Sequence, residues 1–227
     1  MREGWDEPIS PYTLVSLSAQ REDWLVRETT WFLKRVFKRI DVTSRSLITL
    51  IEPGSCFAGS LLELVLAADR SYMLLGSRDG DNRPAASLRL GALNFGAYAM
   101  PNGLSRLASR FLGAPEHLEA ARTLIGQSLD AEAAEQAGLV TVTPDDIDWD
   151  DEIRLALESR ASFSPDALTA MEASLRFAGP ETIESKVFGR LSAWQNWVFQ
   201  RANAVGEAGA LKRYGSGQRA EFDKRRV

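Results

Sequence analysis

The sequence contains very few of the residues that form disulfides, bind metals or act as paired nucleophile and base. Among its 227 residues are one cysteine, Cys56, and one histidine, His117. A disulfide requires two cysteines, and a zinc site requires three or four cysteine, histidine or carboxylate ligands. An intramolecular disulfide is therefore excluded, and we expect no metal site. His117 lies in a segment typical of a helix start, so we expect acid–base chemistry to depend mainly on carboxylates.

Long apolar runs and an excess of positive charge are also missing. No run approaches the ~18 apolar residues that a membrane-spanning helix needs, and the first residues lack the apolar stretch of a signal peptide. The formal net charge is -4, whereas nucleic-acid-binding domains usually carry a strong basic patch. We therefore expect a cytoplasmic protein that binds neither membrane nor nucleic acid.

The residues that are present predict an α/β fold. The apolar run 47–51 is typical of a buried strand, and it is followed by a turn of mostly small residues, 55–60. Residues 61–69 are apolar almost all round and predict a buried helix, and 72–75 predict a second strand. This order of strand, turn, buried helix and strand is typical of an α/β domain.

Helices are expected to dominate the rest of the chain. A helix is predicted over 21–40, with an apolar face marked by Leu25, Thr29, Phe32, Val36 and Ile40. The other segments expected to be regular are helices over 104–112, 116–125, 131–137 and most of 151–204, and a short strand over 139–142. Near the end, Trp194, Trp197, Val198 and Phe199 predict a core or subunit interface more readily than a ligand-binding cage.

The segment from Gly54 to Asp69 carries the strongest indication of chemistry. A strand that ends in a glycine- and serine-containing turn and opens a helix leaves backbone N–H groups free to bind an anion or a developing oxyanion. Glu63 lies a few residues into this helix, where burial would raise its pKa and the helix N-terminus would lower it. It could act as a general acid or base. A buried glutamate that only hydrogen-bonds within the protein would show the same pattern, and both interpretations stay open.

These residues resemble the signature of the crotonase (enoyl-CoA hydratase/isomerase) superfamily, in which a strand leads to a glycine-rich turn and then to Glu-Leu-x-Leu-Ala-x-Asp, here Glu63–Asp69. Later segments agree in order and spacing, at 96–107 and 124–140. Within the superfamily, the chain is similar to the C-terminal half of the benzoyl-CoA-dihydrodiol lyases, from about Trp24 to the end. The segments that carry this similarity are 52–59, 94–96, 194–197 and 203–207.

The resemblance implies a crotonase-like core of ββα spiral type, shortened at the N-terminus, over residues 1–145. A helical C-terminal region and basic tail would occupy 146–227. It also implies a site for an acyl-CoA thioester, with Ser60 offering a backbone N–H, Gly59 beside it, and Glu63 matching a catalytic glutamate. The other residues that it places at the site are Asn94, as a catalytic residue that hydrogen-bonds the substrate, and Cys56, Phe95 and Gly96, as oxyanion- or substrate-binding residues.

The function implied is the opening of the ring of 2,3-epoxybenzoyl-CoA with water and release of formate, as in aerobic benzoate degradation. No cofactor is expected beyond the coenzyme A of the substrate, and the expected assembly is a homo-oligomer. Two alternatives from the same residues are a general enoyl-CoA hydratase/isomerase and a non-catalytic crotonase-like module for oligomerisation or scaffolding.

The sequence departs from the family pattern in three respects. Nothing in residues 1–23 matches the loop that supplies the first oxyanion donor, and 16–20 is the only stretch in the right place. The position of the second catalytic acid falls near Ala86 and Ser87, where there is no carboxylate. The lyases are also longer, so we expect either a truncated relative or the C-terminal portion of a larger protein.

Two basic clusters could meet the phosphates of coenzyme A. This expectation rests on charge alone, because a basic helix end or tail is equally typical of a solvated surface. The residues concerned are Lys34, Arg35, Lys38 and Arg39 in the first helix, and Lys212 and Arg213 in the tail.

Overall fold

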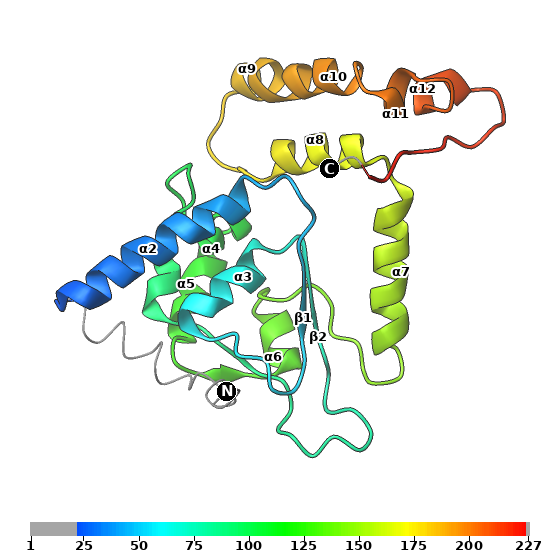
Figure 1. Cartoon of the computed structure of the whole chain (residues 1–227). Helices are drawn as coiled ribbons and strands as arrows, with labels where there is room; N and C mark the ends of the chain where they lie inside the picture. The colour runs from blue at the N-terminus through cyan, green and yellow to red at the C-terminus, as the bar shows by residue number, and fades with distance from the viewer. Residues whose placement is uncertain (1–21, 226–227) are drawn as a thin grey trace, which may run out of the picture. The chain divides into compact units, whose positions relative to one another are not determined.

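The computed structural model describes residues 22–225 and divides into two compact units (Figure 1). Unit 1 consists of the chain up to Asp41 together with Leu47–Glu152, and unit 2 consists of Val42–Ser46 and the chain from Ile153 onward. The boundary between the two units thus falls after Glu152, within a helix. The domain boundary expected at 145/146 stays a prediction, because compactness does not define a functional domain.

Unit 1 has the mixed helix-and-strand character that the sequence predicts. Its elements in chain order are α2 (Trp24–Asp41), β1 (Ile48–Ile51), η1 (Gly59–Leu61), α3 (Leu62–Ala67), β2 (Arg70–Met73), β3 (Leu88–Arg89), η2 (Ala92–Phe95), α4 (Arg106–Arg110), α5 (Pro115–Thr123), β4 (Ser128–Leu129), α6 (Ala131–Gln136) and the start of α7 (Trp149–Ser162).

The predicted strand, turn, helix and strand are confirmed. β1 pairs in parallel with β2, with Ile51 opposite Met73, and α3 makes the connection between them. Leu62 and Val65 of α3 have no exposed surface and pack in the same core cluster as Ile51 and Met73. The apolar helix thus covers the side of the parallel pair that carries Ile51 and Met73, whereas Leu50 of β1 is 39% exposed.

The remaining strand pairings of unit 1 differ from the prediction. The strand predicted over 139–142 forms only a single bridge, between Tyr72 and Val142. The antiparallel pair β3–β4 was not predicted, because two-residue strands carry no periodicity that a sequence pattern can reveal.

Helix α2 is predicted correctly in extent, but much of the apolar face predicted for it is exposed, although Ile40 packs against a core cluster. Leu25, Phe32 and Val36 are 58%, 57% and 38% exposed, whereas Phe37 and Asp41 are buried. The rotation of the helix follows from its partners in unit 1, because the Phe37 ring packs edge-on against Tyr98 and Asp41 pairs with an arginine of α4.

Unit 2 is helical, as expected. Its elements are the rest of α7, α8 (Pro165–Leu175), α9 (Ile183–Lys186), the π-helical turn η3 (Val187–Leu191), α10 (Ser192–Val198), α11 (Ala202–Val205) and α12 (Ala210–Arg213). Helix α10 packs along α8, and Trp194, Val198 and Phe199 line an apolar groove of about 410 Å³ between them. None of the described helices is long and apolar enough to cross a membrane.

Candidate active site

The turn between β1 and α3 places two small residues at the start of a helix. Ala58 is extended, Gly59 takes a positive φ of 52°, and both Gly59 and Ser60 are buried. The left-handed conformation favours glycine here, since a side chain would clash with its own backbone. Within the 3-10 turn η1, the N–H of Leu61 donates to the carbonyl of Ala58. The N–H of Ser60 therefore precedes the helical hydrogen bonds, as an oxyanion donor must.

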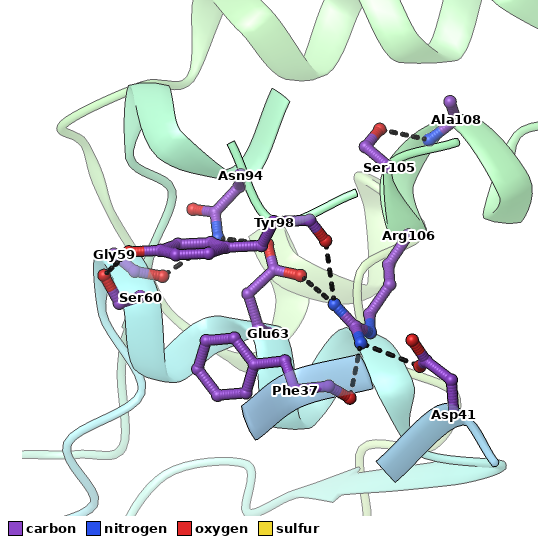
Figure 2. Close-up of polar contacts among 10 residues, drawn as sticks. All are labelled: Phe37, Asp41, Gly59, Ser60, Glu63, Asn94, Tyr98, Ser105, Arg106 and Ala108. Atoms are coloured by element: carbon purple, nitrogen blue, oxygen red, sulfur yellow. Dashed lines mark hydrogen bonds and ion pairs between the residues drawn. The ribbon is translucent and has the colours of Figure 1, made fainter. Parts of the chain in front are cut away.

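Glu63 lies one turn further on, with its carboxylate enclosed by protein. Its side chain is 1% exposed. Oε1 accepts a hydrogen bond from Nδ2 of Asn94 at 2.8 Å, and Oε2 accepts one from Nη1 of Arg106 at 2.7 Å. Figure 2 shows the carboxylate between these two side chains, which come from η2 and α4. Each oxygen is thus fixed by a different partner.

Arg106 joins Glu63 to helix α2. Its Nη2 donates to Oδ1 of Asp41 at 2.7 Å and to the carbonyl of Phe37 at 3.1 Å, and Nη1 also reaches the carbonyl of Tyr98 at 3.3 Å. The side chains of Arg106 and Asp41 are 2% and 1% exposed. Two carboxylates therefore share one buried guanidinium.

Asn94 connects Glu63 to the turn that carries Ser60. Its Nδ2 donates to the carbonyl of Gly59 at 2.9 Å as well as to Glu63, and its Oδ1 accepts from the N–H of Gly91 at 2.8 Å. These partners fix which end of the amide is oxygen, because a flip would place donors against donors. The bonds of Asn94 all go to the chain, so in this structure it positions neighbouring groups.

Ser60 and Tyr98 form a second buried contact at the same site. Ser60 Oγ and Tyr98 OH are 2.5 Å apart, and the Tyr98 ring packs edge-on to Phe37. Burial raises the pKa of the Tyr98 hydroxyl, so it stays protonated and can donate. The hydroxyl of Ser60 is thus held in place while its backbone N–H opens the helix.

Burial dominates the electrostatics of Glu63. Desolvation raises its pKa above the ordinary 4.5, the hydrogen bond from Asn94 and the charge of Arg106 oppose that rise, and the charge of Asp41 adds to it. A carboxyl group whose pKa is raised by burial and neighbours is a common property of general acids and bases. The same properties are also found in structural ion-pair networks.

The structure brings together four of the residues expected at the site: Gly59, Ser60, Glu63 and Asn94. Phe95 and Gly96 follow Asn94 along the chain but line a separate pocket of about 470 Å³ against α2. Cys56 is exposed in the loop before the turn. Binding roles for these three residues stay predictions.

The basic residues expected to meet coenzyme A belong to different units. Lys34, Arg35 and Lys38 lie on α2 of unit 1 with partly or fully exposed side chains, whereas Lys212 lies on α12 of unit 2. No interaction joins any of them to Glu63 or Ser60 among residues 22–225. Their role in binding phosphate stays a prediction. Residues 16–20, which occupy the place of the loop expected to supply the first oxyanion donor, lie outside the described residues.

Three residues of the network were not identified from the sequence: Asp41, Tyr98 and Arg106. Two signals could have found the ion pair. Arg106 stands between Leu104 and Leu107, two residues that are expected to be apolar parts of a predicted helix, and Asp41 ends a helix whose C-terminus disfavours an acid. Within the described chain, no cluster of three or more histidine, cysteine or acidic side chains is arranged to hold a metal ion.

The chain is similar to known proteins in sequence and in fold. The chain is 54% identical over 213 residues to a benzoyl-CoA-dihydrodiol lyase of Aromatoleum evansii. The match covers 93% of the chain, which spans 37% of the length of that lyase. No protein-family model matches the chain.

Solved structures show the same fold at low sequence identity. An enoyl-CoA hydratase/isomerase of Cupriavidus metallidurans CH34 is similar with a TM-score of 0.62 and 19% identity, over 93% of this chain and 73% of that one. An enoyl-CoA hydratase of Bacillus anthracis gives 0.56 and 15%, over 87% and 70%. The chain therefore has the crotonase fold of the enoyl-CoA hydratase/isomerase superfamily and is, over 213 residues, a sequence relative of part of a benzoyl-CoA-dihydrodiol lyase.

Proposed function

We propose that the chain provides the acyl-CoA site of an enzyme that opens the ring of 2,3-epoxybenzoyl-CoA with water and releases formate. The observation that carries this proposal is the 54% identity to benzoyl-CoA-dihydrodiol lyase across the segment that contains Ser60 and Glu63. The chain spans 37% of that relative, so the activity of the whole relative is part of the proposal.

The geometry supports two steps of such a reaction. The N–H of Ser60, at the start of the helix, would polarise the thioester carbonyl and stabilise an enolate-like intermediate. Glu63, with its raised pKa, would exchange a proton with water at Oε1, which keeps lone-pair capacity beyond the single bond from Asn94. Neither step needs a metal or a redox cofactor.

The test is formate release from 2,3-epoxybenzoyl-CoA by the purified chain. Glu63→Gln keeps the size of the side chain and removes the base, so we expect formate release to be abolished. Glu119→Gln is the matched control, because Glu119 is an exposed glutamate of α5 paired with Arg122. Equal rates in the Glu63→Gln variant and the wild type would overturn the role of Glu63.

One observation favours a second candidate function. Both oxygens of Glu63 are already bonded within the protein, as expected for a structural network in a non-catalytic crotonase-like module. Such a module predicts no turnover and weak benzoyl-CoA binding. Isothermal titration with benzoyl-CoA separates the two, since a tight, saturable site contradicts a pure scaffold and binding without formate release contradicts the ring-opening activity.

A further inference from the structure

We propose that Arg106 is a positioning residue for Glu63: its guanidinium holds Oε2, so that Oε1 is directed to Asn94 and the turn that carries Ser60. The inference rests on the proposed function, because it says how the carboxylate is held for that chemistry.

The guanidinium is itself fixed from several sides. Its two terminal nitrogens bond to Glu63 in α3, to Asp41 and the carbonyl of Phe37 in α2, and to the carbonyl of Tyr98. A planar group with donors in a rigid fork transmits this fixed orientation to the carboxylate. The Arg106 guanidinium also lies 5.8 Å from the centre of the Phe37 ring, which limits its movement further.

The network is a poor device for stability alone. Taking one guanidinium and two carboxylates out of water is costly, and apolar side chains of similar volume often stabilise a protein as much or more. Within residues 22–225 the Nε of Arg106 has no hydrogen-bond partner, which adds the cost of an unpaired buried donor. Apolar side chains in place of Arg106 and Asp41 could not hold the Glu63 carboxylate in one orientation, whereas the guanidinium does.

The network also couples the protonation of Glu63 to Asp41. The charged and titratable groups that face Glu63 are Arg106 from α4, Asp41 from α2 and Tyr98 after η2, with the neutral Asn94 from η2. Asp41 competes with Glu63 for the same cation and opposes its ionisation. Neutralising Asp41 should therefore leave Arg106 to Glu63 and favour the ionised carboxylate.

The test follows the protonation of Glu63 by infrared spectroscopy of the full chain. The carboxyl C=O band of Glu63 is identified as the band that is missing in Glu63→Gln. The quantity measured is the pH midpoint at which this band loses half its intensity. In Asp41→Asn, we expect this midpoint to fall by about one pH unit, because the removal of a like charge within a few ångströms has an effect of that order. Asp148→Asn, at an exposed aspartate of unit 1, is the matched control and should leave the midpoint in place.

Arg106→Lys and Arg106→Met complete the test. Lysine keeps the charge but loses the fork, so we expect kcat for formate release to fall while KM changes little. Methionine removes the charge, and the midpoint should rise. If Arg106→Met does not fold, the test rests on Asp41→Asn. A midpoint in Asp41→Asn equal to that of the Asp148→Asn control overturns the proposal, whatever the thermal stability of Asp41→Asn.

The infrared measurement does not depend on turnover. A wild-type chain that releases no formate would contradict the proposed function, and a lowered midpoint in Asp41→Asn together with a raised midpoint in Arg106→Met would still support the control of Glu63 through Arg106. Formate release that is lost in Glu63→Gln, together with an unmoved midpoint in Asp41→Asn, would overturn the positioning role and leave the proposed function in place.

Discussion

Nη1 of Arg106 lies 2.7 Å from Oε2 of Glu63, although 43 residues separate them along the chain. The other oxygen of the same carboxylate faces the amide of Asn94. One side of Glu63 is thus bound to a charge and the other to a neutral donor that also contacts the Gly59 carbonyl. The orientation of the carboxylate relative to the Ser60 turn follows from these two bonds.

The raised pKa of Glu63 predicts a pH-dependent difference in stability between the wild type and Glu63→Gln. Between pH 4.5 and the pKa in the folded state, the folded protein binds more protons at Glu63 than the unfolded chain does. The contribution of Glu63 to stability is therefore fully present below pH 4.5 and is lost as the pH rises through the pKa in the folded state.

Urea unfolding from pH 4 to pH 7 measures this effect. The free energy of unfolding of the wild type minus that of Glu63→Gln should fall with rising pH, by at most about 1.4 kcal/mol per pH unit. A difference that is constant or rises over this range would contradict the direction of the pKa shift.

Asn94→Ala should destabilise unit 1. The change removes the bonds from Asn94 to Glu63, to the Gly59 carbonyl and from the Gly91 N–H, at a cost of about 2–4 kcal/mol for three hydrogen bonds. Asn82→Ala, in an exposed loop, is the control and should cost far less. Equal unfolding midpoints for the two variants in urea would show that the Asn94 bonds do not stabilise the site.

Gly91→Ala should disturb the Ser60 turn without removing any polar group. A Cβ at Gly91 would lie 3.2 Å from the Cα of Gly59 and 3.7 Å from Oδ1 of Asn94, so the turn must move. We expect a stability loss of about 1–2 kcal/mol from overpacking, and weaker benzoyl-CoA binding in titration calorimetry. Gly189→Ala, where a Cβ meets nothing within 4 Å, should bind as the wild type does. Unchanged binding by Gly91→Ala would argue against a role of this turn in recognition.

A separate ion-pair network in unit 2 is centred on a buried glutamate. Glu172, with a side chain 6% exposed, accepts bonds from Arg160, from Arg176 at 3.2 Å and from Ser46 at 3.1 Å. Glu172→Ala leaves two cations without this partner and should cost about 2–3 kcal/mol, less than a fully buried pair because Arg160 is partly exposed.

The control for Glu172 is Glu158→Ala, which breaks an exposed pair with Arg154. This change should cost no more than about 0.5 kcal/mol. Thermal unfolding of both variants measures the difference, and equal melting temperatures would show that the Glu172 network contributes no net stability.

The local pattern predicted the elements that hold the candidate site. The strand ending before Gly54, the turn at Gly59 and Ser60, and the helix carrying Glu63 are consecutive, so their order follows from apolar runs and small residues. The positions of all three could be derived from a single stretch of sequence.

The partners of Glu63 could not be derived in the same way. Arg106 is 65 residues from Asp41 and 43 from Glu63, and nothing local specifies that the three meet. The residues of α2 that are buried could not be derived for the same reason, since Phe37 and Asp41 face inward because of Tyr98 and Arg106. Leu25, Phe32 and Val36 follow the helical period more regularly than Phe37 and Asp41 do, but this pattern does not show which part of the chain packs against α2.

The most direct test of the central claim is the carbonyl stretch of benzoyl-CoA labelled with ¹³C at the thioester carbon, measured by isotope-edited infrared spectroscopy with and without the protein. If the N–H of Ser60 polarises the thioester, the band should move to lower frequency as the site saturates. Ser60→Ala keeps this N–H and should retain the shift. A bound benzoyl-CoA whose carbonyl band stays at its frequency in water would contradict the account.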